Sequence, residues 1–262
     1  MRTIAIMNQK GGVGKTTTSV NLSAALAASG KRVLLIDLDP QAHASLHLGL
    51  TFEKGFASVY DVLVKDLSLD SVRRQAGENL WLVPAHLDLA AADFELASTL
   101  GREKILADKI AEDTMEFDYI IIDCPPSLGV LTLNALVAAE EVIIPLQPHF
   151  LALHGLSKLL ETIELVAKRL NGKLRVSGVV LCLFDGHTTL ANDVRDDVKA
   201  FFGANEGRPA AWRNVVVFDT NIRRNIRLAE APSYGQSIFD YDPKSNGAED
   251  YRALAREVLA ME

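Results

Sequence analysis

Short runs of apolar residues recur along the chain and alternate with segments of helical spacing. Between these runs, residues 16–29 and 151–170 carry apolar side chains at intervals of three and four, the period of an amphipathic helix. Strands that are apolar throughout are typical of a parallel sheet that is buried on both faces. We therefore predict an α/β fold with a mostly parallel twisted sheet of about seven or eight strands and helices on both faces. The expected strands lie at residues 3–7, 32–37, 80–84, 118–123, 141–146, 176–184 and 215–218.

Length and composition are those of one globular domain. The chain has 262 residues, 48% of them apolar and 23% charged, so we expect residues 1–262 to form a single domain. Residues 201–214 are rich in Gly, Ala and Asn and are expected to form a loop. No apolar stretch reaches the roughly 20 residues of a membrane span, and we expect a cytoplasmic protein. Cys124 and Cys182 lie in or beside expected strands, which favours packed, reduced thiols.

A glycine-rich loop follows the first expected strand and precedes a helix. Residues 8–18 read NQKGGVGKTTT. Glycines leave the backbone N–H groups of such a loop open to phosphate oxygens, and the helix directs its positive dipole end at the same point. A chance glycine turn would not explain the ordered strand, loop, lysine and helix, and a dinucleotide fingerprint G-x-G-x-x-G cannot be read here. The loop glycines are Gly11, Gly12 and Gly14.

The polar residues of this loop match the needs of a nucleoside triphosphate. Lys15 would neutralise the β- and γ-phosphates, Thr16 would supply a hydroxyl to Mg²⁺, and Thr17 would reach the α-phosphate. The loop departs from the common pattern G-x-x-x-x-G-K-[ST], because its first glycine is replaced by Gln9 and a second lysine, Lys10, follows.

Three aspartates stand at the ends of two expected strands. Asp37 and Asp39 are two residues apart and would face the same side if the strand continued, and Asp123 ends another apolar run. A carboxylate on a buried strand is costly unless a cation or a donor waits for it, and the Mg²⁺ of a nucleotide is the natural partner. As an alternative, these aspartates would serve only as capping residues.

Taken together, the motifs resemble a known family, the ParA/MinD group of deviant-Walker P-loop ATPases, and especially the short Soj-like ParA partition proteins. The resemblance rests on NQKGGVGKTTT, LLIDLDPQ, IIIDCPPS and NIRLAEAPSYG, and it extends over almost the whole chain. It implies an ATPase that converts ATP to ADP and phosphate with Mg²⁺, and an ATP-dependent homodimer.

The resemblance also implies roles for single residues. Lys10 would reach across the dimer interface to the phosphates of the partner, as an arginine finger does. Asp39 would position or activate the attacking water, Asp37 and Asp123 would hold the magnesium shell together with the Thr16 hydroxyl, and Asn225 would contact adenine. The implied catalytic residues are Lys10, Lys15 and Asp39, and the implied nucleotide-binding residues are Lys10, Gly11, Gly12, Val13, Gly14, Lys15, Thr16, Thr17 and Asn225.

Histidines mark where the chain departs from this family. Ala42 and His43 stand where the family usually reads Gly-Asn, and His47 follows four residues later. Two histidines at this spacing on a helix can bind zinc, but without a third ligand nearby we favour a surface or interface pair. His149 and His154 occupy positions where glutamates are common, which would change ribose contacts or the pH response of dimerisation.

A basic segment offers a surface for DNA. Residues 208–227 hold five arginines and one acid, a local net charge of +4 in a chain whose total is −7. Charge concentrated in this way is typical of contact with a phosphate backbone, although a solvated arginine face is the alternative. We assign non-specific DNA binding to Arg223, Arg224 and Arg227.

The expected function is therefore DNA partition. An ATP-bound sandwich dimer would bind nucleoid DNA without sequence preference, and a ParB-like partner would stimulate hydrolysis and so segregate a chromosome or plasmid. One alternative is a MinD-like or other ParA-like ATPase that positions a non-DNA cargo; a membrane-bound form would need a basic amphipathic C-terminal helix, whereas residues 248–262 are acidic on balance. Another alternative, a metal-cluster carrier, would need paired interface cysteines.

Overall fold

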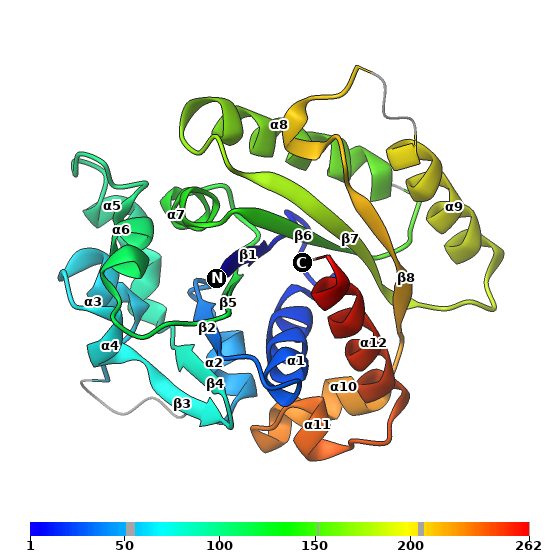
Figure 1. Ribbon diagram of the computed structural model, residues 1–262, viewed down its shortest axis with the longest axis horizontal. Helices are drawn as coiled ribbons and strands as arrows, with labels where there is room; N and C mark the ends of the chain where they lie inside the picture. Colours follow the sequence, from blue (N-terminus) through cyan, green and yellow to red (C-terminus); the bar gives the residue numbers. More distant parts are fainter. Residues whose placement is uncertain (51–55, 151, 204–206, 262) are drawn as a thin grey trace.

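The fold is built around one eight-stranded sheet with the strand order β3-β4-β2-β5-β1-β6-β7-β8 (Figure 1). The computed structural model describes residues 1–50, 56–150, 152–203 and 207–261. Every neighbouring pair of strands is parallel except β3 and β4. The predicted α/β fold is confirmed. The strands are β1 (Arg2–Ile6), β2 (Val33–Asp37), β3 (Arg74–Gly77), β4 (Leu80–Val83), β5 (Tyr119–Asp123), β6 (Glu141–Leu146), β7 (Arg175–Phe184) and β8 (Val216–Arg223).

Helices cover both faces of this sheet. Two of them match the helical segments expected from the sequence, α1 (Lys15–Ala28) and α8 (Ala152–Arg169). The other α-helices are α2 (His43–His47), α3 (Val59–Val64), α4 (Leu69–Val72), α5 (Ala92–Glu95), α6 (Ile105–Glu112), α7 (Val130–Ala138), α9 (Thr189–Gly203), α10 (Ile226–Glu230), α11 (Ile238–Tyr241) and α12 (Asn246–Ala260). Short 3₁₀ helices are η1 (Leu87–Ala91), η2 (Ala210–Trp212) and η3 (Ala231–Tyr234).

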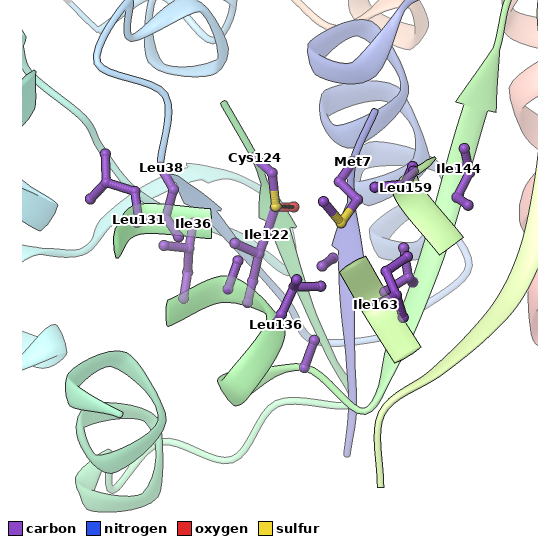
Figure 2. Packing of buried hydrophobic residues seen from close by; sticks show 14 of the residues in the cluster. Met7, Ile36, Leu38, Ile122, Cys124, Leu131, Leu136, Ile144, Leu159 and Ile163 are labelled. Atoms are coloured by element: carbon purple, nitrogen blue, oxygen red, sulfur yellow. Dashed lines mark hydrogen bonds between the residues drawn. The ribbon is translucent and has the colours of Figure 1, made fainter. Parts of the chain in front are cut away.

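Two apolar cores lie on opposite faces of the sheet. One core joins the sheet to α3 and to α6 through α9, and the other joins it to α1 and α12. Figure 2 shows part of the first core, where Ile36 and Ile122 of neighbouring strands gather with Leu131 and Leu136 of α7. Since both faces are covered, the central strands must be apolar throughout, which is why their runs could be read in the sequence.

The elements missed or misplaced by the sequence analysis lie toward the two edges of the sheet. Strand β3 was not expected, because it alternates half-buried and exposed residues and has no apolar run. Strand β8 extends beyond the expected 215–218 as far as Arg223.

The expected loop at residues 201–214 is wrong at its start and near its end. Helix α9 continues to Gly203, and η2 occupies Ala210–Trp212; residues 204–206 lie outside the described part. An aromatic cluster explains this order, because the rings of Phe201 and Trp212 stack at 6.2 Å and Arg208 lies 5.1 Å over the Phe201 ring.

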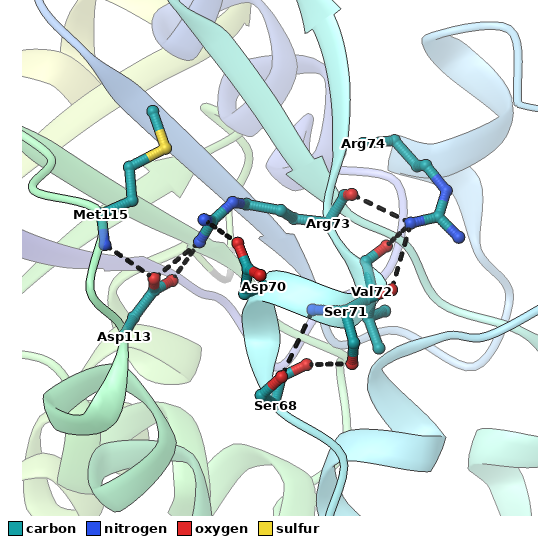
Figure 3. Close-up of polar contacts among 8 residues, drawn as sticks. All are labelled: Ser68, Asp70, Ser71, Val72, Arg73, Arg74, Asp113 and Met115. Atoms are coloured by element: carbon teal, nitrogen blue, oxygen red, sulfur yellow. Dashed lines mark hydrogen bonds and ion pairs between the residues drawn. The ribbon is translucent and has the colours of Figure 1, made fainter.

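An arginine holds the antiparallel edge in place. Arg73, just before β3, donates two hydrogen bonds of 2.7 and 2.5 Å to the carboxylate of Asp113, which precedes β5, and also pairs with Asp70 (Figure 3). Both Arg73 and Asp113 are largely buried. Both hydrogen bonds to Asp113 come from Nη1, while Nη2 pairs with Asp70, so Arg73 ties the start of β3 to the segment that leads into β5.

Both cysteines are free and buried, as the sequence analysis expected. Cys124 follows β5, and Cys182 lies within β7. Within the described ranges, no helix combines the length and the apolar character that crossing a membrane would require.

Candidate nucleotide site

The glycine loop connects the end of β1 to the start of α1. Gly12 and Gly14 have φ angles of +73° and +92°, a left-handed conformation that other residues adopt only with strain. A Cβ atom placed on Gly11 or Gly12 would meet nothing within 4 Å. Backbone conformation and not crowding therefore requires glycine at Gly12, and this side of the loop is open to a ligand. Val13 is buried and would contribute only its backbone.

The two lysines of the loop are presented differently. Lys15 is 7% exposed, and its Nζ donates a hydrogen bond of 3.1 Å to the carbonyl oxygen of Lys10. Burial lowers the pKa of Lys15, while the nearby carboxylates of Asp123 and Asp39 raise it. Lys10 itself is exposed, and its backbone N–H donates to Asn8 Oδ1 at 3.0 Å. One cation thus faces into the site, and the other stands at its mouth.

Parallel pairing brings two of the predicted aspartates together. Strands β2 and β5 are neighbours, and Asp37 and Asp123 are direct register partners at their carboxyl ends. Asp37 is fully buried and accepts three hydrogen bonds: from the backbone N–H and hydroxyl of Ser45 at 2.9 and 2.7 Å, and from the backbone N–H of Asp39 at 3.1 Å. Burial still raises the pKa of Asp37 to about 6.

Asp123 is also fully buried but accepts fewer hydrogen bonds than Asp37 does. The Ser19 hydroxyl donates to its Oδ1 at 2.8 Å, and its Oδ2 has no hydrogen-bond partner in the part of the chain that the structure describes. Burial and the charge of Asp37 raise the pKa of Asp123 to about 7, while the hydroxyls of Ser19 and Thr16 lower it. An orphaned carboxylate oxygen near a threonine hydroxyl is a hard oxygen donor set that fits Mg²⁺.

Asp39 stands in the turn after β2 and not on the strand. Because β2 ends at Asp37, the continuation that would have placed both side chains on one strand face does not occur. Asp39 is 9% exposed and accepts a hydrogen bond of 2.9 Å from the backbone N–H of Gln41. Its carboxylate borders the same cavity as Lys15.

A cavity of about 710 Å³ brings most of the predicted residues together. A smaller cavity of about 120 Å³ adjoins it through Gly14 and Thr17 and is lined by Asn225. Asn225 caps α10, and its Oδ1 accepts the Arg227 N–H at 2.8 Å. The larger cavity is lined by Gly11, Gly12, Gly14, Lys15, Thr16, Thr17, Asp39, Pro40, Gln41, His43, Ala90, Pro125, Pro126, Ser127 and Leu183.

The histidines separate into two environments. His43 lines the large cavity. His47 is 3% exposed, its Nε2 is buried without a partner among the described residues, and burial lowers its pKa to about 4. The expected surface or interface pair is therefore wrong for His47, because the inner face of α2 packs against the core. Burial and the charge of Lys10 lower the pKa of His149, and His154 is exposed on α8.

The arginine segment is less basic than its sequence indicates. Arg223 forms ion pairs with Asp250 at 2.6 Å and with Glu249 at 2.8 Å, and these contacts raise its pKa. Arg227 pairs with Glu230 at 2.8 Å and Asp242 at 3.4 Å.

Arg224 differs from its two neighbours. It is exposed and has no side-chain ion pair among the described residues. The assignment of DNA binding to these arginines remains a prediction, with Arg224 the one whose charge is not offset within the described chain.

Two serines at this site were not anticipated. Ser19 and Ser45 are fully buried and donate to Asp123 and Asp37, respectively. The available signal was weak: each is a small polar residue on a helix side that the sheet covers, and such a residue needs a polar partner inside.

These features together define a P-loop nucleoside triphosphatase: a strand, a glycine loop with a buried lysine, and buried carboxylates at neighbouring strand ends. A family model described as AAA domain matches residues 1–176, which contain all of these groups. The chain is 49% identical over 258 residues to the sporulation initiation inhibitor protein Soj of Bacillus subtilis, covering 98% of each chain. It is 44% identical over 259 residues to the chromosome partitioning protein ParA of Myxococcus xanthus, covering 98% of this chain and 88% of that one. The chain therefore belongs to the ParA/Soj family of partitioning ATPases.

Solved structures share the fold. One is described as the cobyrinic acid a,c-diamide synthase of Mycobacterium smegmatis with bound ATP analogue and magnesium; it is 39% identical with a TM-score of 0.83, and the match covers 99% of this chain and 94% of that one. The cell division ATPase MinD of Pyrococcus furiosus is 26% identical with a TM-score of 0.77, covering 100% and 99% of the two chains. The first structure holds an ATP analogue and magnesium. The oxygen donors and lysines of the present site fit the same two ligands.

Proposed function

We propose that this protein is a Mg²⁺-dependent ATPase that partitions DNA. In this proposal, two ATP-bound copies form a sandwich dimer that binds nucleoid DNA without sequence preference. A ParB-like partner then stimulates hydrolysis to ADP and phosphate, and a chromosome or plasmid is segregated. The protein would act in the cytoplasm, associated with the nucleoid. The observation that carries the proposal is the pair of lysines in one loop, of which Lys15 is buried and lines the large cavity while Lys10 is exposed.

Each residue of the site has a distinct task in this scheme. Magnesium, when bound with ATP, would neutralise negative charge on the phosphates. Thr16, Asp37 and Asp123 would hold it, partly through water. Lys15 neutralises the β- and γ-phosphates of its own subunit. Asp39 accepts a hydrogen bond from the attacking water at the wall of the cavity.

Residues around the loop would complete nucleotide binding. The backbone from Gly11 to Gly14 donates N–H groups to phosphate oxygens, and Thr17 contacts the α-phosphate. Asn225 lies on the adjoining smaller cavity, which supports a contact with adenine. Lys10 would enter the partner's site and stabilise charge that develops during phosphoryl transfer, so ATP would both join the dimer and be cleaved in it.

The test compares Lys10→Ala with Lys158→Ala, an exposed lysine of α8. The Lys10→Ala variant should bind ATP normally as a monomer but should form no ATP-dependent dimer on a sizing column and lose turnover. Lys158→Ala should behave as the wild type does. A Lys10→Ala variant that hydrolyses ATP at the wild-type rate would refute the cross-subunit role.

DNA binding is tested separately. The wild-type protein should retain random-sequence duplex DNA only with ATP, because dimerisation doubles the number of phosphate contacts. ATP-dependent dimers that never bind DNA would favour a relative that positions another cargo, such as a MinD-like protein.

A further inference from the structure

Ser45 contacts the metal-site carboxylate Asp37 twice. Its backbone N–H and its hydroxyl both donate to Asp37 Oδ2, at 2.9 and 2.7 Å. Its hydroxyl oxygen also accepts the backbone N–H of Ala85 at 3.0 Å, just beyond β4. Because a hydroxyl has one hydrogen, a donor on its oxygen leaves that hydrogen for Asp37. Ser45 therefore joins α2 and the end of β4 to the end of β2.

The carboxylates at this edge of the sheet are held unequally. Among the described residues, Asp37 accepts three hydrogen bonds, two of them from Ser45, whereas Asp123 accepts one from Ser19 and its buried Oδ2 has no partner. A carboxylate that already accepts several hydrogen bonds gains little free energy from a direct metal ligand bond. A buried oxygen without a hydrogen bond gains much more. Asp123 is itself fully buried, so its Oδ2 is an interior acceptor that a cation or its bound water would satisfy, and Asp37 adds fixed charge beside it.

We propose that Ser45 is a positioning residue for magnesium: it holds Asp37 beside Asp123 Oδ2 so that the carboxylate pair is preformed when MgATP enters. The proposal rests on the ATPase function proposed above. Through Asp37, Ser45 also fixes the turn that carries Asp39, because the other oxygen of Asp37 accepts the Asp39 N–H. Loss of the Ser45 hydroxyl should therefore weaken magnesium more than it weakens the nucleotide.

The experiment measures magnesium dependence and not turnover. Binding of a fluorescent ATP analogue to the full chain is titrated with Mg²⁺ and, separately, is measured in EDTA. For Ser45→Ala, the Mg²⁺ concentration that gives half-maximal binding should rise roughly tenfold, as expected when a hydrogen bond to a charged group is lost. Affinity in EDTA should stay within about twofold of the wild-type value, since the loop and Lys15 are untouched.

Ser58 provides a matched control. It is also a buried serine whose hydroxyl bonds an aspartate, Asp61, at 3.3 Å and accepts a backbone N–H, that of Tyr60, at 3.3 Å. Ser58→Ala should lower the melting temperature without moving the Mg²⁺ titration. Ser45→Thr, which keeps the hydroxyl, should restore the titration to about twofold of the wild-type value.

Several results would overturn the positioning role of Ser45. If Ser45→Ala leaves the titration within twofold, or lowers binding equally in EDTA and in Mg²⁺, the positioning role is wrong. Should Ser45→Ala not fold, Ser45→Cys replaces it, and the weak thiol donor should still shift the titration by about threefold or more; an unshifted titration overturns the proposal. Absence of Mg²⁺-dependent binding in the wild type would instead refute the ATPase function itself.

Discussion

Charge is handled in opposite ways at the nucleotide site and in the arginine segment at the end of β8. At the carboxyl ends of β2 and β5, two carboxylates are buried side by side, and burial raises their pKa values. At the end of β8, by contrast, Arg223 meets acids of α12 that compensate its charge. The first region holds two buried carboxylates whose negative charge a bound cation would neutralise further. In the second region, acids of the protein itself already offset the charges of Arg223 and Arg227.

The two regions differ in how much their charged groups cost in folding free energy. A buried carboxylate without a counter-charge destabilises the protein and is retained only where a ligand makes use of it. Exposed ion pairs such as that of Arg227 with Glu230 stabilise little and leave the arginine able to exchange partners. Strain and uncompensated charge therefore mark the nucleotide site, whereas a count of arginines does not by itself mark a DNA surface.

The largest effect is expected at Lys15. Lys15→Ala removes a buried cation that interacts with Asp123 and Asp39 and that would neutralise the β- and γ-phosphates. We expect ATP affinity, measured by calorimetry with Mg²⁺, to fall by at least about 100-fold, since two phosphate interactions in a half-enclosed site are lost. Lys158→Ala is the control and should bind ATP as the wild type does. Unchanged ATP affinity in Lys15→Ala would refute the P-loop assignment.

Asp123→Asn should separate folding from function. The pKa of Asp123, raised to about 7 from the 3.8 of an ordinary carboxyl, means that the folded state holds a proton that the unfolded state has lost. The contribution of Asp123 to the stability of the nucleotide-free protein therefore falls as pH rises from about 4 to 7. At pH 8, Asp123→Asn should stabilise the nucleotide-free protein by roughly 2 kcal/mol, and MgATP should stabilise the variant less than it stabilises the wild type.

Thermal melting between pH 6.5 and 8 checks this prediction. The window excludes His47, whose pKa is lowered to about 4 and whose protonation in the unfolded state destabilises the fold below pH 6.5. A nucleotide-free variant that is less stable than the wild type at pH 8 would show that the buried charge is compensated in some other way.

The arginines should divide into structural and DNA-facing residues. Arg223→Ala leaves Asp250, which is 6% exposed, without its charged partner, and should cost about 1–2 kcal/mol of unfolding free energy because Arg223 itself is half-exposed. Arg224→Ala should change stability by less than about 0.5 kcal/mol. In ATP-dependent binding to random duplex DNA, however, Arg224→Ala should flatten the slope of log affinity against log salt by about two units per dimer. Equal effects of both changes on the salt slope would contradict this division.

Local motifs were predictable, and contacts between distant elements were not. The strand, loop and helix around Lys15 are continuous in sequence, and the meeting of Asp37 with Asp123 follows from parallel strand ends. The burial of His47, the contacts of Ser45 and the pairing of Arg223 with α12 depend on how helices dock on the sheet, which residue spacing does not encode. The local net charge of the arginine segment was counted correctly. It omitted the acids that pair with Arg223, because they lie more than 20 residues away in the chain.

The smallest expected effect concerns backbone strain beside the carboxylates. Ala42 has φ +53° and ψ +31°, a left-handed conformation that costs an alanine roughly 1–2 kcal/mol, and its side chain is buried. Ala42→Gly removes that strain but also removes a buried methyl group, worth about 0.8 kcal/mol, and frees the unfolded chain. These terms nearly cancel, so we expect a change within about 0.5 kcal/mol. Ala44→Gly, two residues later within α2, has no strain to relieve and should cost about 1.5–2 kcal/mol. Chemical denaturation of both variants measures the difference, and equal losses would mean that Ala42 carries no strain.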